Sequence, residues 1–337
     1  MALLKIDYYS EILGMVRTVN VLYPEPRKNP DKDVPTTDIP VLYLLHGMSG
    51  NQDSWLNRSG IERIVRSTNL AVVMPSTDLA WYTNTTYGAR YYDAIVTELP
   101  QVLQNFLPNL STKREKNFIA GLSMGGYGAF KIALASNKFS YAASLSGAIS
   151  FEKVAREEIG NLAYWQGIFG DLDKFDESVN SVQKLASDFT KTFGDEKPKL
   201  YAWCGHQDFL YPANNFAVQD LKNKDFDIIY ETADGTHEWY YWTKMMRSGK
   251  MHRERVKLSA SSLRYFGRFS KRSPKIEMTK AKSKDKVPPV VKRNFGAVIN
   301  RSNNVRLKLS SALIPKLARI FWTKDLLTDM ENPVRPA

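Results

Sequence analysis

FIAGLSMGGYGAFKIAL, residues 118–134, carries the clearest structural signal in the chain. Its apolar start predicts a buried strand, and its second half, from residue 125 on, is typical of a helix. Between them, residues 121–125 match G-x-S-x-G, the strand–turn–helix elbow that exposes a nucleophilic serine. The two glycines of the pattern remove the clashes of so tight a turn. We therefore predict Ser123 as a nucleophile, with the Met124 backbone N–H facing a developing oxyanion.

The rest of the body argues against a chance match to this short pattern. Short apolar runs alternate with amphipathic stretches, the pattern of βα units in a mostly parallel sheet flanked by helices. The predicted strands are 41–45, 71–74, 117–120, 199–204 and 227–232, and the predicted helices are 59–68, 91–106 (with a kink or a new start at Pro100), 125–136 and 213–224. Residues 150–197 are interpreted as a polar, irregular insertion over one end of the sheet. This order predicts the α/β-hydrolase fold.

A serine needs a base to become a good nucleophile, and the chain has four histidines. His237 follows the last predicted strand, and Asp208 follows the strand that ends at Cys204. Both therefore lie at the carboxyl edge of the sheet, where open parallel sheets place their sites. The order Ser, Asp, His along the chain is that of α/β-hydrolases. We predict His237 as the base and Asp208 as the residue that orients it.

Other residues near these positions are the alternatives. Asp234 lies three residues before the predicted base on the same loop and is badly placed to support its imidazole, and Glu238 has a similar problem. His206 is interpreted as a bystander beside the predicted acid, and His252 as a solvated residue of a basic tail. For Asp208 itself, the alternative is a role in a turn or a helix cap.

The sequence His46-Gly47-Met48 after the first strong strand predicts the other half of an oxyanion hole. In this fold one donor comes from that loop, and a glycine lets the backbone approach the substrate carbonyl. We predict the Met48 N–H as this donor and His46 as a hydrogen-bonding residue that holds the loop, rather than a second base. Four aromatic residues are candidate walls of the acyl or alcohol pocket, with ordinary packing as the alternative: Trp55, Trp81, Tyr82 and Trp239. This chemistry needs no metal and no organic cofactor.

The charge of the chain divides it into two regions. Residues 1–243 contain 23 Lys and Arg against 29 Asp and Glu, a balance of −6, whereas residues 244–337 contain 24 against 6, a balance of +18. The asymmetry predicts a folded domain over 1–243 and a basic, irregular and partly disordered C-terminal extension over 244–337. Lysine and proline in 271–293 favour a linker there. The extension is either genuine or the product of a frameshift or fusion.

The composition of the chain excludes several further classes of protein. The single cysteine excludes a disulfide framework or a multi-cysteine zinc site within one chain. No segment reaches the roughly 18 apolar residues of a membrane-spanning helix, and the N-terminus lacks the pattern of a secretory signal. The expectation is a cytoplasmic protein with no transmembrane segment. The basic tail leaves open the binding of nucleic acid or another anionic polymer or surface, and homo-oligomer formation is also open.

Five stretches carry a resemblance to a known family: HGMSG (46–50), WYTNTTYG (81–88), FIAGLSMGGYGAFKIAL (118–134), WCGHQDFL (203–210) and GTHEWYYW (235–242). Together they are similar to the esterase D / S-formylglutathione hydrolase-like family, and most of all to bacterial tributyrin esterases. The resemblance covers about residues 1–242. It implies a cytoplasmic-type serine carboxylesterase that acts on short acyl esters, from acetyl to butyryl. It also implies catalytic roles for the serine, aspartate and histidine predicted above.

Two departures from the family bear on the substrate and on the tail. S-formylglutathione hydrolases have a cysteine in the loop after the His-Gly pair, where this chain has Ser49 and Gly50, which weakens a glutathione thioester as the substrate. The family continues past the histidine with an apolar helix, whereas basic sequence begins here at Thr243. Cleavage of acetylated-carbohydrate or feruloyl esters, S-formylglutathione hydrolysis and a catalytically inactive fold are the alternatives.

Overall fold

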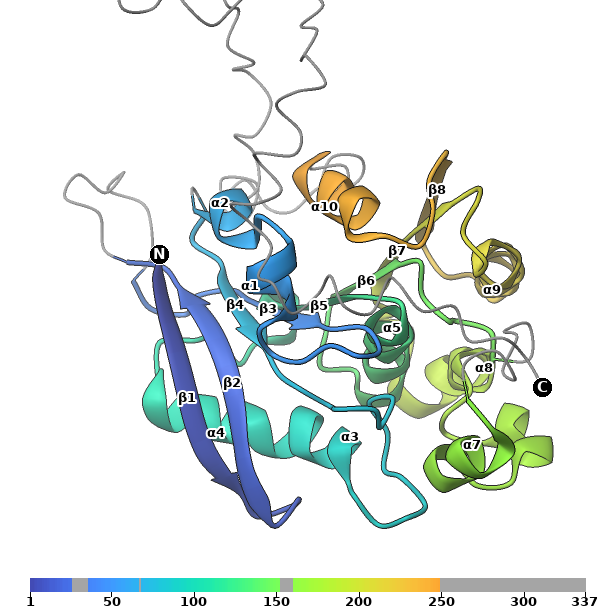
Figure 1. Cartoon of the computed structure of the whole chain (residues 1–337), viewed down its shortest axis with the longest axis horizontal. Helices are drawn as coiled ribbons and strands as arrows, with labels where there is room; N and C mark the ends of the chain where they lie inside the picture. The colour runs from blue at the N-terminus through green and yellow to red at the C-terminus, as the bar shows by residue number, and fades with distance from the viewer. Residues whose placement is uncertain (26–35, 67, 152–159, 249–337) are drawn as a thin grey trace, which may run out of the picture. The chain divides into compact units, whose positions relative to one another are not determined.

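The computed structural model describes residues 1–25, 36–66, 68–151 and 160–248. These residues form an eight-stranded sheet with the strand order β1-β2-β4-β3-β5-β6-β7-β8 (Figure 1). β1 (Ala2–Ser10) and β2 (Met15–Tyr23) form an antiparallel hairpin, and β2 also pairs antiparallel with β4 (Ala71–Met74). From β4 onward all neighbours are parallel: β3 (Val41–Leu45), β5 (Asn117–Leu122), β6 (Tyr141–Leu145), β7 (Lys199–Gly205) and β8 (Ile228–Ala233).

The predicted mostly parallel sheet is confirmed, and three strands outside the prediction complete it. In β1 the burial of the side chains alternates between exposed and half-buried, which is a weaker signal in the sequence than a continuous buried run. β6 has the sequence Tyr-Ala-Ala-Ser-Leu, whose alanines have low β-propensity. Both elements are strands because neighbouring strands supply their hydrogen-bond partners.

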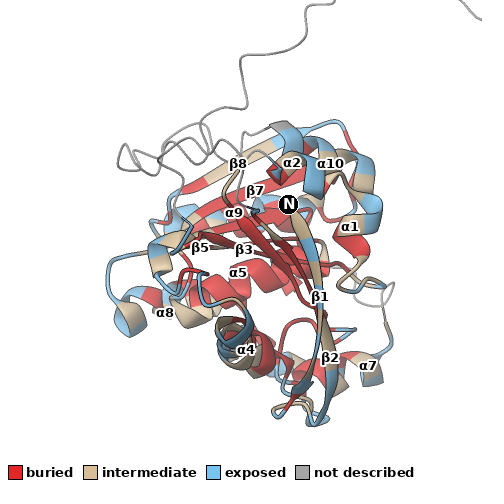
Figure 2. Cartoon of the chain, turned by 90° about the vertical axis from the view of Figure 1, so that its left-hand side faces the viewer, coloured by how far each residue is buried: buried red, intermediate tan, exposed pale blue. Residues whose placement is uncertain are grey.

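Helices cover both faces of the sheet. One core cluster joins the strands to α1 (Ser54–Arg58), α2 (Ile61–Val65) and α10 (Trp239–Ser248). The other joins them to α4 (Leu99–Phe106), α5 (Met124–Ser136), α8 (Val182–Phe193) and α9 (Tyr211–Asn223). Alternate residues of β3 enter the two clusters, so the strand is buried on both faces. Figure 2 shows the buried residues concentrated in the sheet and in α5.

The predicted helix over 91–106 is confirmed, and Pro100 marks a change in its winding. α3 (Tyr91–Asp93) passes through a π-helical stretch, η1 (Ala94–Glu98), into α4. Proline has no N–H to donate to the Val96 carbonyl one turn earlier. The Lys138 ammonium donates to that carbonyl instead, at 2.7 Å, so the backbone continues in helical form past the proline.

The prediction of an irregular insertion over 150–197 is wrong for its described part. Residues 160–197 contain α7 (Leu162–Phe169), a 3₁₀ helix η4 (Leu172–Glu177) and α8. α8 buries Val182, Ala186 and Phe189, a helical spacing, and the Ser181 side chain caps its first turn by accepting the Lys184 N–H. The polar outer faces of η4 and α8 concealed the pattern in the sequence.

The predicted boundary at residue 243 falls inside α10. Met245 and Met246 are each 9% exposed and belong with Trp242 to the core cluster that also contains α1 and α2. Residues 244–248 therefore continue the folded region. The rest of the predicted extension, with its linker at 271–293, lies outside the described residues. Across the described ranges, no helix has the length and apolar character needed to cross a membrane.

Candidate active site

Ser123 lies in the turn between β5 and α5, at the start of that helix. Its φ of 53° and ψ of −121° are strained values for a residue with a side chain. Glycines two residues before and two residues after Ser123 allow the turn to close and to pack against β3. A Cβ on Gly121 would lie 2.2 Å from the Gly125 carbonyl oxygen, and one on Gly125 would lie 2.5 Å from the Leu45 carbonyl oxygen. The Ser123 N–H donates to the Leu145 carbonyl at 2.9 Å, which ties the elbow to β6.

The structure brings together the three side chains singled out in the sequence. His237 Nε2 lies 3.0 Å from Ser123 Oγ, and His237 Nδ1 lies 2.9 Å from one Asp208 carboxylate oxygen and 3.1 Å from the other. The Asp208 side chain is fully buried, whereas the His237 side chain is 22% exposed. A carboxylate at Nδ1 holds the proton on that nitrogen and leaves Nε2 free to accept the serine proton. The arrangement can therefore generate a serine nucleophile.

The end of β7 and the loop that follows β8 approach each other through a pair of glycines. A Cβ on Gly205 would lie 2.1 Å from the Gly235 carbonyl oxygen. Gln207 binds both polar groups of Gly235: its N–H donates to the carbonyl at 3.1 Å, and its Oε1 accepts the Gly235 N–H at 2.7 Å. We call this pair of hydrogen bonds the Gln207 clamp. It lies one residue before Asp208 and two residues before His237, so it sets the spacing between their loops.

The alternative acid, Asp234, has other partners. Its Oδ1 lies 3.1 Å from His206 Nδ1 and accepts a hydrogen bond from Gln207 Nε2 at 3.3 Å. The His206 hydrogen bond lowers the pKa of Asp234, whose side chain is 89% exposed. Asp208 is the carboxylate that contacts the imidazole, and His206 lies at the edge of the site.

Two aromatic rings that sequence reasoning did not assign flank the imidazole of His237. The Phe209 ring centroid lies 4.7 Å from that of His237, and the Trp242 centroid lies 4.9 Å away, edge-on. Trp242 is buried and its Nε1 donates to Ser146 Oγ at 3.0 Å, whereas Phe209 is 54% exposed. The sequence did contain a signal that could have identified them. Both residues lie inside the stretches 203–210 and 235–242 that carried the family resemblance.

His46 has the structural role predicted for it: it holds the loop after β3. The residue is 1% exposed, its Nε2 accepts the Thr77 N–H at 3.1 Å, and its Nδ1 lies 2.7 Å from the Gly47 carbonyl oxygen. Because a backbone N–H can only donate, Nε2 carries no proton and Nδ1–H donates to Gly47. Burial lowers the pKa of His46 to about 4, so the ring is neutral near pH 7.

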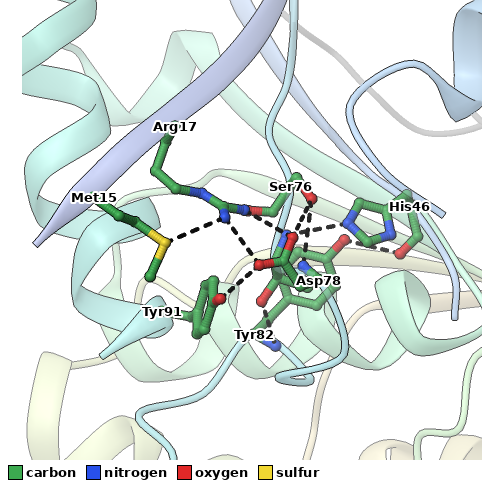
Figure 3. A network of polar contacts seen from close by, with 8 residues as sticks. Met15, Arg17, His46, Ser76, Asp78, Tyr82 and Tyr91 are labelled. Carbon is green, nitrogen blue, oxygen red and sulfur yellow. Dashed lines mark hydrogen bonds and ion pairs between the residues drawn. The ribbon is translucent and has the colours of Figure 1, made fainter. Parts of the chain in front are cut away.

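An ion pair to the N-terminal hairpin anchors the segment that holds His46. Arg17 of β2 donates to both carboxylate oxygens of Asp78, at 2.9 and 3.0 Å, and to the Ser76 carbonyl at 3.1 Å. The Tyr91 hydroxyl donates to Asp78 at 2.6 Å. Figure 3 shows these side chains converging beside His46. The hairpin outside the parallel sheet therefore supports the loop that lies next to Ser123.

The peptide between Gly47 and Met48 lies against the elbow. A Cβ on Gly47 would lie 3.3 Å from Ser123 Cβ. The Gly47 carbonyl is held by His46 and by the Gly50 N–H at 3.2 Å, and in a planar trans peptide the Met48 N–H points the opposite way. Met124 is the first residue of α5, where helix N–H groups have no partner within the helix. Met48 and Met124 stay the predicted oxyanion donors.

The four aromatic residues predicted as pocket walls do not lie together. Trp55 packs edge-to-face on Trp239 at 5.1 Å, and its Nε1 donates to the Leu45 carbonyl at 2.9 Å. Trp81 and Tyr82 belong to the core cluster on the other face, and the Tyr82 hydroxyl donates to the His46 carbonyl at 2.8 Å. Trp55, Trp81 and Tyr82 are at most 2% exposed. These contacts favour the packing alternative, and the wall role stays a prediction.

Comparisons with known proteins identify the family of the chain. The model of a family described as "Putative esterase" matches residues 10–252, more than half of the chain. An acetyl esterase of Caldicellulosiruptor saccharolyticus is 34% identical over 254 residues, which cover 72% of this chain and 95% of that protein. The family match continues past residue 242, where the resemblance was predicted to end. That result agrees with the buried end of α10.

Two solved structures from Staphylococcus aureus share the fold. FphF, a fluorophosphonate-binding serine hydrolase, superposes with a TM-score of 0.65 at 32% identity and covers 73% of this chain and 96% of its own. The S-formylglutathione hydrolase FrmB gives a TM-score of 0.64 at the same identity and coverage. With a parallel sheet, an elbow serine and relatives of this similarity, the chain belongs to the esterase family, has the α/β-hydrolase fold and is a carboxylic ester hydrolase.

Proposed function

We propose that this protein is a serine carboxylesterase that hydrolyses short-chain acyl esters, from acetyl to butyryl and tributyrin-like, through an acyl-enzyme. The observation that carries the proposal is the line of contacts from the Ser123 hydroxyl through His237 to the buried Asp208. In this proposal Ser123 is the nucleophile, His237 the general base and Asp208 the residue that orients it.

Acylation begins when Ser123 Oγ attacks the ester carbonyl carbon and its proton passes to His237 Nε2. The carbonyl oxygen becomes an oxyanion, which accepts hydrogen bonds from the backbone N–H groups of Met48 and Met124. The C–O bond to the alcohol then breaks, and the alcohol leaves with the proton from His237. Asp208 stays ionised and stabilises the imidazolium during these steps.

Deacylation repeats the same steps with water. His237 removes a proton from a water molecule, the resulting hydroxide adds to the acyl carbonyl, and the bond to Ser123 Oγ breaks as the serine takes the proton back. The acid is released and the starting state returns. Both halves of the reaction use the same three side chains, and His237 passes the proton between Ser123 Oγ and the oxygen that leaves or enters.

The short-chain preference rests on the resemblance to tributyrin esterases and on a 34% identical relative that is named an acetyl esterase. S-formylglutathione hydrolysis is a second candidate, because FrmB is 32% identical. The loop after His46-Gly47 disfavours it, since Ser49 and Gly50 replace the cysteine of that group.

The test is the activity of the full-length protein on p-nitrophenyl esters from acetate to decanoate, with S-formylglutathione as a separate substrate. We expect the highest kcat/KM between acetate and butyrate. Ser123→Ala should lower kcat by on the order of 10⁶ and abolish fluorophosphonate labelling. Ser136→Ala, at the far end of the same helix, is the control and should change neither. Near wild-type turnover by Ser123→Ala would refute the proposal.

A further inference from the structure

Phe209 is an exposed aromatic ring that lies against the proposed base. Its ring centroid is 4.7 Å from that of His237, with an angle of 50° between the ring planes, and the residue is 54% exposed. Single exposed apolar side chains are common on protein surfaces, so what marks Phe209 is its contact with the proposed base rather than its exposure alone.

The backbone on both sides of Phe209 is anchored. Asp208 is 3% exposed and Leu210 is 2% exposed, and the Leu210 N–H donates to Asp208 Oδ1 at 2.9 Å. The loop therefore presents the phenyl ring from a fixed position. A rigid aromatic surface of this kind can contact a ligand at low cost in conformational entropy.

Groups other than Phe209 also hold the imidazole in place. Asp208 holds Nδ1, and the buried Trp242, tied to Ser146, packs edge-on against the ring. Phe209 is the one of the two flanking rings that faces solvent. Its exposed surface is therefore available to whatever approaches His237 from outside.

In the proposed reaction, that approaching group is the alcohol half of the ester. His237 Nε2 donates a proton to the leaving alcohol oxygen, which must lie about 3 Å from that nitrogen. A substituent on the oxygen then lies within reach of a ring whose centre is 4.7 Å from the centre of the imidazole. Aromatic rings attract flat apolar partners in stacked or edge-on arrangements.

We propose that Phe209 contacts the alcohol half of the substrate and favours esters whose alcohol carries an aromatic or other flat apolar ring. This inference rests on the proposed function, because it requires His237 to protonate the leaving alcohol. Phe209 thereby acts on the selection of the alcohol and leaves the acyl preference unchanged.

The test compares benzyl butyrate with ethyl butyrate in the full-length protein. Both esters form the same butyryl-enzyme, so a difference in kcat/KM reports only binding and acylation. Phe209→Ala should lower kcat/KM for benzyl butyrate about tenfold, equivalent to about 1.4 kcal/mol, and for ethyl butyrate by less than about twofold. Phe209→Tyr keeps the ring and should stay near wild type on both. Phe106→Ala, which removes a 59% exposed ring at the end of α4, should affect neither ester.

The outcomes separate this inference from the proposed function. An equal loss on both esters in Phe209→Ala would overturn the contact and make Phe209 a positioning residue for His237. Unchanged values on both esters would overturn it as well. If Phe209→Ala does not fold, Phe209→Leu and Phe209→Tyr provide the same comparison between an apolar side chain and a ring. A wild-type protein that cleaves neither ester and escapes fluorophosphonate labelling would refute the esterase proposal itself.

Discussion

His46 and His237 both follow strands of the parallel sheet at the same edge, yet their surroundings differ in every respect that matters for chemistry. Both nitrogens of His46 are bound to backbone groups, and the residue is 1% exposed. His237 has a carboxylate on one nitrogen and a serine hydroxyl on the other, and its side chain is 22% exposed. A histidine can move protons only where one nitrogen faces a group that exchanges them.

The two regions also differ in how they are anchored. The loop of His46 is supported from the N-terminal hairpin through Arg17 and Asp78, and its histidine is held neutral by burial. The loop of His237 is held to its neighbour by the buried glycine pair and by the Gln207 clamp, whose glutamine is exposed. We therefore expect changes near His46 to alter stability and activity together, and the removal of His237 to alter activity far more than stability.

The largest expected effect comes from removing the imidazole at residue 237. His237→Ala should lower kcat on p-nitrophenyl butyrate by on the order of 10⁶, because Ser123 then has no base. The free energy of unfolding, measured by urea denaturation, should fall by about 1–3 kcal/mol, because the fully buried Asp208 carboxylate loses its hydrogen-bond partner. Retention of a few per cent of wild-type kcat would show that another group serves as the base.

The next largest effect is expected at residue 46, where one substitution should lower both the free energy of unfolding and kcat. His46→Leu leaves the Thr77 N–H buried without its acceptor and frees the Gly47 carbonyl of one donor. It should cost about 1–3 kcal/mol of unfolding free energy and, if the Met48 N–H loses its orientation, about 100-fold in kcat.

His46→Asn is the matched variant. Its side-chain amide takes the place of Nδ1 and can donate to Gly47, but it cannot reach Thr77. It should recover most of the kcat while the loss of stability remains. Equal kcat losses in both variants would contradict the view that His46 acts through the Gly47 carbonyl.

A third difference between the histidines appears in the pH dependence of stability. The pKa of His46 is lowered by burial from 6.5 to about 4, so between these values the unfolded chain binds more protons than the folded one. The contribution of His46 is complete above pH 6.5 and is lost as the pH falls towards 4, by about 3 kcal/mol in total.

Unfolding curves of wild type and His46→Asn between pH 4 and pH 8 measure this contribution by difference. Lys131, whose pKa burial lowers from 10.5 to about 7, titrates in a separate window above pH 7. Parallel stability curves for the two proteins below pH 6.5 would show that His46 titrates normally in the folded state.

The smallest effect is expected at the Gln207 clamp. Gln207→Ala removes the acceptor of the Gly235 N–H and should lower kcat about fivefold, equivalent to about 1 kcal/mol, with KM unchanged. Gln207→Glu keeps an acceptor for that N–H and should lose less. Gln219→Ala, an exposed glutamine on α9, is the control. A change in KM rather than kcat would place Gln207 in substrate binding instead of loop positioning.

The sequence by itself determined the features that depend on short stretches of chain. The pattern of the elbow lies within five consecutive residues, so the glycines at 121 and 125 identify Ser123 before the rest of the fold is known, although the clash that Gly125 avoids is with Leu45 of β3. The apolar runs before Asp208 and His237 likewise place both residues at the carboxyl edge, because parallel strands end on the same side. Chain order and this placement were enough to select the three residues that meet.

Only the tertiary structure decided which groups surround Ser123, Asp208 and His237. β1, β2 and β6 are strands because neighbouring strands supply their hydrogen-bond partners. α10 continues past residue 243 because Met245 and Met246 pack into an apolar core, which a count of charged residues does not reveal. The tautomer of His46 depends on Thr77, which is 31 residues away, and the exposure of Phe209 beside His237 depends on the meeting of two loops. Burial and hydrogen-bond partners arise from contacts between distant segments, and no local pattern of residues encodes them.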